Sequence, residues 1–244
     1  MINIIPAIDI ISGRCVRLTR GDYNSKREYS AKPLEIAKAY EDAGCQYLHL
    51  VDLDGAKSSH IVNYHTLELI ASHTNLIIDF GGGLKSDDDL RIAFECGARK
   101  ITGGSVAIKS PTTMQNWLST YGSEKIILGA DSRDGMIATN GWTEGSTQRV
   151  IPFIKEWTDR GITQTISTDI NCDGTLSGPS LSLYSDILNE MPQLYLIASG
   201  GVGSMDDIYA LNQINVPAVI VGKALYEGKI TLKDLELFNT NRGC

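Results

Sequence analysis

The stretch Asp79-Phe-Gly-Gly-Gly-Leu-Lys-Ser-Asp-Asp-Asp-Leu90 recurs later in the chain as Ile197-Ala-Ser-Gly-Gly-Val-Gly-Ser-Met-Asp-Asp-Ile208. The glycine pair, the serine and two of the acidic residues coincide when the two stretches are aligned. Ile101-Thr-Gly-Gly matches Ile220-Val-Gly-Lys, and Leu50-Val-Asp-Leu-Asp-Gly55 matches Thr168-Asp-Ile-Asn-Cys-Asp-Gly174, at nearly the same offset. A period this long exceeds that of a solenoid repeat, so it indicates a duplicated half-domain. The expected halves are residues 1–124 and 125–244.

Short apolar runs bounded by polar residues predict eight buried strands. They are residues 2–8, 47–51, 76–78, 100–102, 126–130, 164–168, 195–198 and 218–221. Segments with helical spacing lie between them, such as residues 33–44, which begin with proline and end with glycine. Ser86 and Ser204 are expected to cap helices whose first turns are acidic.

The alternation of strands and helices predicts an α/β fold with a parallel sheet. The chain has 244 residues, which fits a single (β/α)8 barrel, or TIM barrel, of about 250 residues. An open doubly wound sheet is the alternative. The two-fold internal repeat favours the barrel, because two four-stranded halves complete each other's edges.

The composition limits the possible partners and compartments. A hydrophobic content of 42% supports one large core over residues 1–244. The net charge of −7 argues against nucleic acid or anionic membranes as partners. The sequence has neither a spanning apolar stretch nor a basic region before its first apolar run. Five scattered cysteines, at positions 15, 45, 96, 172 and 244, predict reduced thiols in a cytoplasmic protein. We expect a monomer without a bound metal.

Two aspartates end equivalent apolar runs. Asp9 ends Ile4-Ile-Pro-Ala-Ile-Asp9, and Asp131 ends Ile126-Ile-Leu-Gly-Ala-Asp131. A carboxylate at the end of a buried strand is costly unless it is solvated or functional. Two of them on matching strands predict one site with an acid on one side and a base on the other. His49 lies inside a predicted strand and is interpreted as a core histidine.

Glycine clusters follow four of the predicted strands. They are Gly81-Gly82-Gly83, Gly103-Gly104-Ser105, Ser199-Gly200-Gly201 and Gly222-Lys223-Ala224. Glycines after a strand let backbone N–H groups approach an anion, and loops seven and eight of a barrel commonly hold phosphate. The duplication predicts a second phosphate site after strands three and four. Two sites at one barrel mouth suit a small molecule with a phosphate at each end. Tight turns alone would also explain the glycines.

Several longer motifs resemble a known family. They are Ile5-Pro-Ala-Ile-Asp-Ile10, residues 16–23, Gly129-x-Asp131 with Ala138-Thr-Asn-Gly-Trp142, residues 168–179, and Ala198-Ser-Gly-Gly-Val202. Together they resemble the phosphoribosylformimino-5-aminoimidazole carboxamide ribotide isomerases (ProFAR isomerases) of histidine biosynthesis. The resemblance covers essentially the whole chain. It implies an Amadori rearrangement of a bis-phosphorylated aminoaldose to an aminoketose, on a two-fold symmetric barrel and without a cofactor or metal.

The resemblance also implies roles for individual residues. Asp131 would be the general acid that opens the ribose ring, and Asp9 the general base that removes the C2′ proton. Thr168 would hydrogen-bond the substrate near the reacting carbons, and Asp169 would orient it. Arg17 and Trp142 would lie on lid loops, with Trp142 stacked on the imidazole. The sequence departs from the family pattern at Cys172, Lys85 and Gly104-Ser105. These departures bear on the affinity for the substrate and leave the two aspartates unchanged.

Three alternatives remain open. The chain could be the cyclase subunit of imidazole glycerol phosphate synthase, which is also a duplicated barrel with two aspartates. It could be a bifunctional isomerase that also accepts phosphoribosyl anthranilate. A non-catalytic phosphate-ligand-binding barrel is the third alternative, although it would not need both aspartates.

The two loops expected to form lids are long and polar. They span residues 12–30 after the first strand and residues 132–146 after the fifth. Loops of this length in a compact domain are usually functional or disordered. We therefore expect both to be open or poorly ordered without ligand and closed with it.

Overall fold

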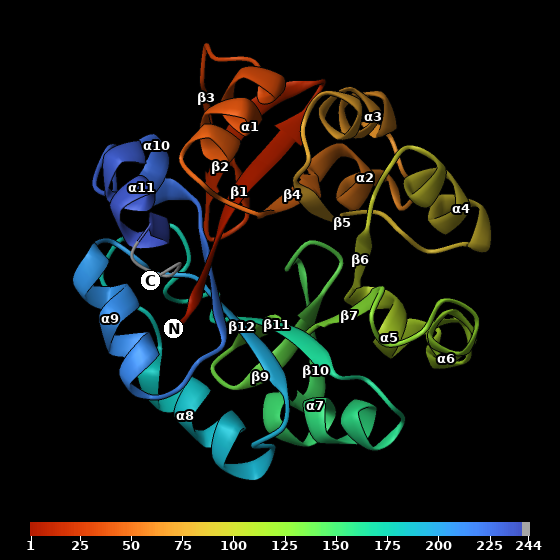
Figure 1. The fold of residues 1–244 in the computed structure, drawn as a ribbon. Helices are drawn as coiled ribbons and strands as arrows, with labels where there is room; N and C mark the ends of the chain where they lie inside the picture. Colours follow the sequence, from red (N-terminus) through yellow and green to blue (C-terminus); the bar gives the residue numbers. More distant parts are fainter. Residues whose placement is uncertain (241–244) are drawn as a thin grey trace.

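Eight parallel strands close into a barrel in the computed structural model, which describes residues 1–240 (Figure 1). In spatial order they are β1 (Asn3–Ile11), β4 (Tyr47–Asp52), β5 (Ile77–Gly81), β6 (Lys100–Gly103), β7 (Ile126–Gly129), β11 (Gln164–Thr168), β12 (Tyr195–Ser199) and β13 (Ala218–Val221). The barrel closes where β13 pairs in parallel with β1, with Ala218 opposite Asn3. The predicted (β/α)8 fold is confirmed and the open sheet is wrong. The duplication stays a prediction, and its second half extends to residue 244, outside the described residues.

A main helix follows each barrel strand and contributes to the outer ring (Figure 1). These helices are α1 (Pro33–Asp42), α3 (Tyr64–His73), α4 (Asp87–Glu95), α6 (Pro111–Tyr121), α7 (Val150–Asp159), α8 (Leu181–Glu190), α9 (Met205–Gln213) and α11 (Leu232–Thr240). Shorter helices start just after three strands: α2 (Leu53–Ser58), α5 (Ser105–Lys109) and α10 (Lys223–Tyr226). Within residues 1–240, no helix combines the length and apolar character needed to cross a bilayer.

The predicted serine caps are confirmed. The Ser86 hydroxyl accepts from the backbone N–H of Asp89 at the start of α4, and the Asp89 carboxylate accepts from the Ser86 N–H in return. Ser204 and Asp207 repeat this capping box at the start of α9. Each box satisfies the N–H of the capping serine and one N–H group of the first helical turn.

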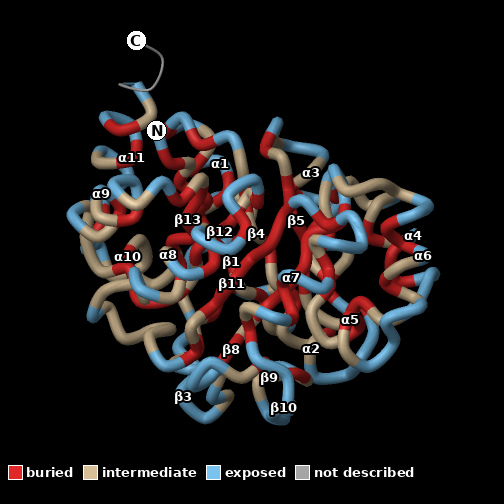
Figure 2. The backbone as a smooth tube through the Cα atoms, turned by 90° about the horizontal axis from the view of Figure 1, so that it is seen from below, coloured by how far each residue is buried: buried red, intermediate tan, exposed pale blue. Residues whose placement is uncertain are grey.

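The core has two layers. Inside the barrel lies a cluster of Ile5, Ala7, Ile127, Ile166, Ile197, Ala218 and Ile220. A larger cluster fills the space between the strands and the helices. Figure 2 shows the strands as the buried centre and the helices with exposed outer faces. Burial on both faces explains why the strands are nearly continuous apolar runs.

The first and fifth βα loops contain antiparallel strands. β1 continues to Ile11, so Asp9 lies within a strand, because β2 (Arg14–Thr19) folds back on β1 and β3 (Asp22–Glu28) pairs with β2. In the fifth loop, β8 (Ser132–Arg133), β9 (Met136–Thr139) and β10 (Glu144–Arg149) form a separate sheet. β3 and β10 are mostly exposed at one end of the barrel (Figure 2). Opening and closing of these loops stays a prediction.

Among the cysteines, four can be placed. Cys15, Cys45, Cys96 and Cys172 are free thiols, and the first two are buried in the core. Burial raises the pKa of the Cys15 and Cys45 thiols to about 11. These two side chains are therefore packing residues. Cys244 lies outside the described residues.

Candidate active site

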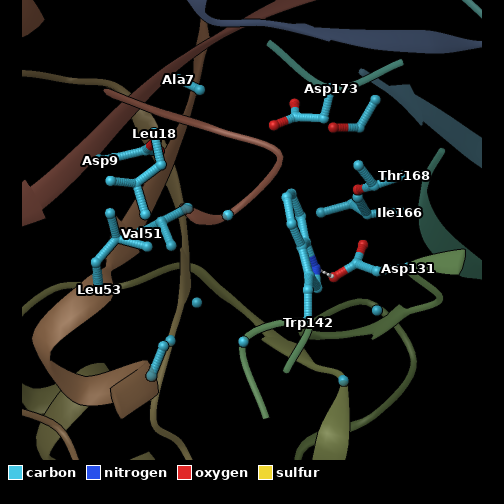
Figure 3. Close-up of a pocket in the computed structure, with 18 of the residues that line it drawn as sticks. Ala7, Asp9, Leu18, Val51, Leu53, Asp131, Trp142, Ile166, Thr168 and Asp173 are labelled. Carbon is cyan, nitrogen blue, oxygen red and sulfur yellow. Dashed lines mark hydrogen bonds between the residues drawn. The ribbon is translucent and has the colours of Figure 1, made fainter. Parts of the chain in front are cut away.

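A cavity of about 260 Å³ opens at the carboxyl ends of the barrel strands (Figure 3). Among the residues predicted from sequence, it is lined by Asp9, Arg17, Gly82, Gly83, Gly104, Ser105, Asp131, Trp142, Thr168, Gly200, Gly201, Gly222 and Lys223. The cavity is smaller than the roughly 300–1,000 Å³ of typical ligand pockets. Trp142 occupies part of its centre (Figure 3).

Asp9 forms an ion pair with Arg17 of β2. Arg17 Nη1 lies 2.6 Å from Asp9 Oδ2, and the two side chains are 11% and 17% exposed. Nη2 donates to the carbonyl oxygen of Ala7, and the guanidinium lies 4.9 Å from the ring centre of Tyr226. Burial alone would lower the pKa of Arg17, but the charge of Asp9, with Tyr226, Tyr40 and Asp173 adding to it, outweighs this effect and the pKa is raised. Arg17 is therefore a fixed cation beside Asp9.

Asp131 follows β7 on the other side of the cavity (Figure 3). Trp142 Nε1 donates to Asp131 Oδ2 at 2.8 Å. Burial raises the pKa of the Asp131 carboxyl, and hydrogen bonds from Thr168 and Trp142 offset only part of this rise. A raised pKa keeps a larger fraction of a carboxyl protonated, as a general acid requires.

Trp142 lies at a strained loop tip. Asn140, Gly141 and Trp142 have φ angles of +53°, +61° and +71°, which is the left-handed region. This conformation costs an L-residue roughly 1–2 kcal/mol and persists only where surrounding contacts impose it. One such contact is the bond to Asp131. Another is Gly21 at the β2–β3 turn, where an added Cβ would lie 2.7 Å from the Trp142 ring.

Asp173 is a third carboxylate in this cavity, and it is not among the site residues predicted from the sequence. Burial and the nearby Asp9 raise the pKa of Asp173 to about 7, against the opposing charge of Arg17. The available signal was its position in the motif Thr168-Asp-Ile-Asn-Cys-Asp173-Gly. The predicted ligand-orienting residue of that motif is Asp169. Its carboxylate accepts from the Asn171 N–H and lies outside the cavity lining.

His49, interpreted from the sequence as a core histidine, lines the cavity with its side chain 13% exposed. Its Nδ1 lies 2.6 Å from Asp79 Oδ2, and Thr102 donates to the same carboxylate. Burial lowers the pKa of the imidazole, but Asp79, with Asp9 and Asp131 further away, raises it above its usual value. The barrel floor therefore carries a histidine biased toward its charged form.

The glycines after β5 and β12 adopt backbone conformations that side chains rarely take. Gly82 and Gly200 both have φ of +98°, and Gly83 and Gly201 have +82° and +85°. A Cβ at Gly82 would lie 2.2 Å from the Asp52 carbonyl oxygen. The turns alone require these glycines, whose place in the cavity wall also leaves their backbone accessible to a ligand.

Gly103, a predicted binding residue, and Asp52 both have close contacts inside the protein. Gly103 lies outside the cavity lining, and its missing side chain makes room for Met114 and Val106. Asp52, at the end of β4, is fully buried. Its carboxylate accepts hydrogen bonds from the N–H groups of Gly55, Val62 and Asn63 and from the Asn63 side chain. It therefore anchors the segment between β4 and α3.

The positions that depart from the family pattern differ in their surroundings. Lys85 lines the cavity, and its Nζ donates to Ser59 Oγ at 2.9 Å. Burial and the charge of Lys109 lower the pKa of Lys85. Cys172 lies outside the lining and beside Gly201, where a Cβ would lie 3.0 Å from its own. On the opposite side of the mouth, Lys223 donates to the Gly174 carbonyl oxygen at 2.6 Å.

A second cavity, of about 420 Å³, lies at the amino ends of the strands. Its rim includes Asn3, Tyr47 and Tyr195, which lie at or near strand starts. His49 lines both cavities and lies between them. Although this cavity is larger, we place the candidate active site at the other end, because Asp9, Asp131 and the glycine turns meet there.

Comparison with known proteins now adds to this geometry. A family model described as "Histidine biosynthesis protein" matches residues 3–231. The chain belongs to this family. The resemblance identified from the motifs is therefore confirmed at the level of the family.

Several curated relatives match over nearly their full length. A protein of Bacteroides fragilis (strain NCTC 9343) is 61% identical over 238 residues, covering 98% of this chain and 100% of the relative. Proteins of Bacteroides thetaiotaomicron and Flavobacterium johnsoniae are each 59% identical, covering 98% and 96% of this chain and 100% and 98% of those proteins. All three are named 1-(5-phosphoribosyl)-5-((5-phosphoribosylamino)methylideneamino)imidazole-4-carboxamide isomerase.

Proposed function

We propose that this protein is the aldose–ketose isomerase of histidine biosynthesis for which these relatives are named, and that Asp9 and Asp131 catalyse its reaction. The observation that carries the proposal is the different environment of two carboxylates at one cavity. Asp9 is paired with the buried cation Arg17, whereas burial raises the pKa of Asp131. Such a division suits one base and one acid.

In the proposed reaction, Asp131 donates a proton to the ribose ring oxygen, and the ring opens to a protonated Schiff base. Asp9 then removes the proton at C2′. The resulting enolamine becomes the ketone when C1′ gains a proton and the C2′ hydroxyl loses one. Only protons move and the atoms of substrate and product are the same, so the chemistry requires neither a cofactor nor a metal.

Two candidate phosphate sites support the choice of a bis-phosphorylated substrate. One combines the Gly82–Gly83 turn with Gly104, Ser105 and the Lys85 ammonium. The other combines the Gly200–Gly201 turn with Gly222 and Lys223. Each includes a lysine, which binds phosphate as a point charge. The glycine N–H groups and the two lysines are the proposed phosphate donors, because the capping serines of α4 and α9 already accept from Asp89 and Asp207 of the first helical turns.

The test is turnover by the purified protein of the aldose substrate named in its relatives, without ammonia or a glutaminase. Formation of the aminoketose would support the isomerase. Turnover only of the ketose, with ammonia supplied, would replace it with the cyclase. Phosphoribosyl anthranilate as a second substrate would identify the bifunctional enzyme. No turnover of any of these, with phosphate still bound, would leave a phosphate-binding barrel.

A further inference from the structure

Asn140 lies between the candidate phosphate site at Ser105 and the loop tip that carries Trp142. Its backbone N–H donates to Ser105 Oγ at 2.9 Å. Its side-chain Oδ1 lies 3.4 Å from Lys85 Nζ, and its Nδ2 donates to Glu144 Oε1 at 2.5 Å. Asn140 therefore contacts two residues proposed to bind phosphate and also β10 of its own loop.

The chain from Asn140 to the catalytic acid is short. Gly141 and Trp142 follow in the same left-handed conformation, and Trp142 donates to Asp131. A strained three-residue tip has to be held at both ends, because it would otherwise relax. Ser105, Lys85 and Glu144 hold one end through Asn140, and Asp131 holds the other.

From this arrangement we infer that Asn140 is a positioning residue, which couples phosphate binding near Ser105 and Lys85 to the placement of Trp142 on Asp131. The inference rests on the proposed function for the identity of that phosphate site. The Ser105 hydroxyl can donate to a phosphate oxygen while it accepts from the Asn140 N–H, so the two bonds are compatible. A phosphate that fixes Ser105 and Lys85 would therefore also fix the loop tip.

The charges around Asn140 favour a loop tip that is held more firmly when phosphate is bound. Lys85 lies near Lys109, and this like charge contributes to lowering the Lys85 pKa. Lys109 is paired with Glu144 at 2.7 Å. A phosphate dianion would relieve the repulsion between the two lysines, which strengthens the set of contacts around Asn140. Linkage then requires that Asn140 in turn increases phosphate affinity.

The experiment measures Trp142 emission while inorganic phosphate is added to the purified protein. Trp117 and Trp157 are buried and supply a background, and Trp142→Phe identifies the signal that belongs to Trp142. We expect the wild-type emission to change with phosphate. Asn140→Gly keeps the left-handed backbone and the N–H that donates to Ser105, and removes only the side-chain contacts with Lys85 and Glu144. In this variant about tenfold more phosphate should be required.

Asp134→Gly is the matched control. Asp134 has φ of +53° on the same loop. Its carboxylate accepts from the side chain of Asn171, which lies in the loop after β11 and away from Asn140 in the sequence. This variant should respond like the wild type. A wild-type response in Asn140→Gly would overturn the inference, as would the lack of any phosphate response in the wild type. Neither result depends on turnover, so a phosphate response without isomerase activity would support the coupling while rejecting the proposed function.

Discussion

Trp142 donates a hydrogen bond to Asp131 at the mouth of the barrel, at 2.8 Å. The two residues lie on the same βα loop, eleven positions apart, and the strained tip from Asn140 to Trp142 brings the indole back over the strand end. The bond holds Oδ2 of the Asp131 carboxyl group, and burial raises the pKa of this group. A substrate that stacks on Trp142 would therefore meet the proposed acid directly.

Loss of either proposed catalytic carboxylate should abolish most turnover. Asp9→Asn and Asp131→Asn are nearly isosteric, so both variants should fold. Each should lower kcat by about 10²–10⁴-fold, the usual contribution of general acid–base catalysis. Steady-state kinetics with the aldose substrate check this, and near-normal turnover in either variant would refute its assignment.

A structural aspartate provides the contrasting case. Asp52→Ala removes the carboxylate that accepts four buried hydrogen bonds. Unsatisfied buried donors cost about 1–3 kcal/mol each, so the free energy of unfolding should fall by about 3 kcal/mol or more. Denaturant unfolding measures this loss. A stable Asp52→Ala variant with impaired kinetics would instead show that Asp52 acts at the site.

The raised pKa of Asp173 should be visible in the pH dependence of the protein's stability. Burial and Asp9 raise the pKa of Asp173 from 3.8 to about 7. The folded state thus binds the proton more tightly than the unfolded chain, and this stabilisation is present below pH 3.8 and lost as the pH rises through about 7. Asp173→Asn lacks the charged form and should therefore unfold at a higher temperature than the wild type above about pH 7.

The difference in melting temperature between Asp173→Asn and the wild type should shrink as the pH falls toward 4. Melting curves across this pH range would measure it. A constant difference at every pH would contradict the raised pKa, because a change in packing alone has no reason to follow the titration of a carboxyl group.

Gly104 offers a cleaner test of the phosphate sites than the neighbouring turns do. A Cβ at Gly82 or Gly201 would lie about 2 Å from backbone oxygens, at positive φ, so substitution there should damage folding. A Cβ at Gly104 would meet only Gly129, with its closest atom at 3.7 Å. Gly104→Ala should keep its melting temperature and raise KM about tenfold or more, the effect of one weakened charge-assisted hydrogen bond.

Anion density supplies an independent check on the same idea. Crystals grown in phosphate should show an anion near Gly104 and Lys85, and another near Gly222 and Lys223. An anion on only one side would leave the two-phosphate substrate without its structural basis.

Trp142 should matter for catalysis more than for stability. Trp142→Ala removes a half-buried ring that belongs to neither hydrophobic core cluster, so the melting temperature should change little. Turnover should fall because the substrate loses its stacking partner and Asp131 loses a hydrogen bond. A large drop in melting temperature together with normal kinetics would make Trp142 a packing residue. The lid expected on the fifth βα loop would then lack its proposed contact with the substrate.

The sequence alone predicted the barrel and many of the residues that line the candidate site. Apolar runs of strand length, separated by capped helices, leave few folds open, because a parallel sheet needs a crossover helix after each strand. The predicted strands at residues 164–168 and 218–221 match β11 and β13, and the caps at Ser86 and Ser204 are confirmed. Local patterns carried these predictions, since hydrophobic period and capping depend on neighbours in the chain.

The tertiary structure decided the features that depend on contacts between distant segments. It separated Asp173, which lines the cavity, from Asp169, which does not, although both belong to one motif. It paired Arg17 with Asp9 through the β2 hairpin, and it assigned Asp52 to an internal anchor. No local pattern encodes which way a loop carboxylate points or which donors surround it. Burial and pairing of charges arise only when the eight strand ends meet, and these set the chemistry of each carboxylate.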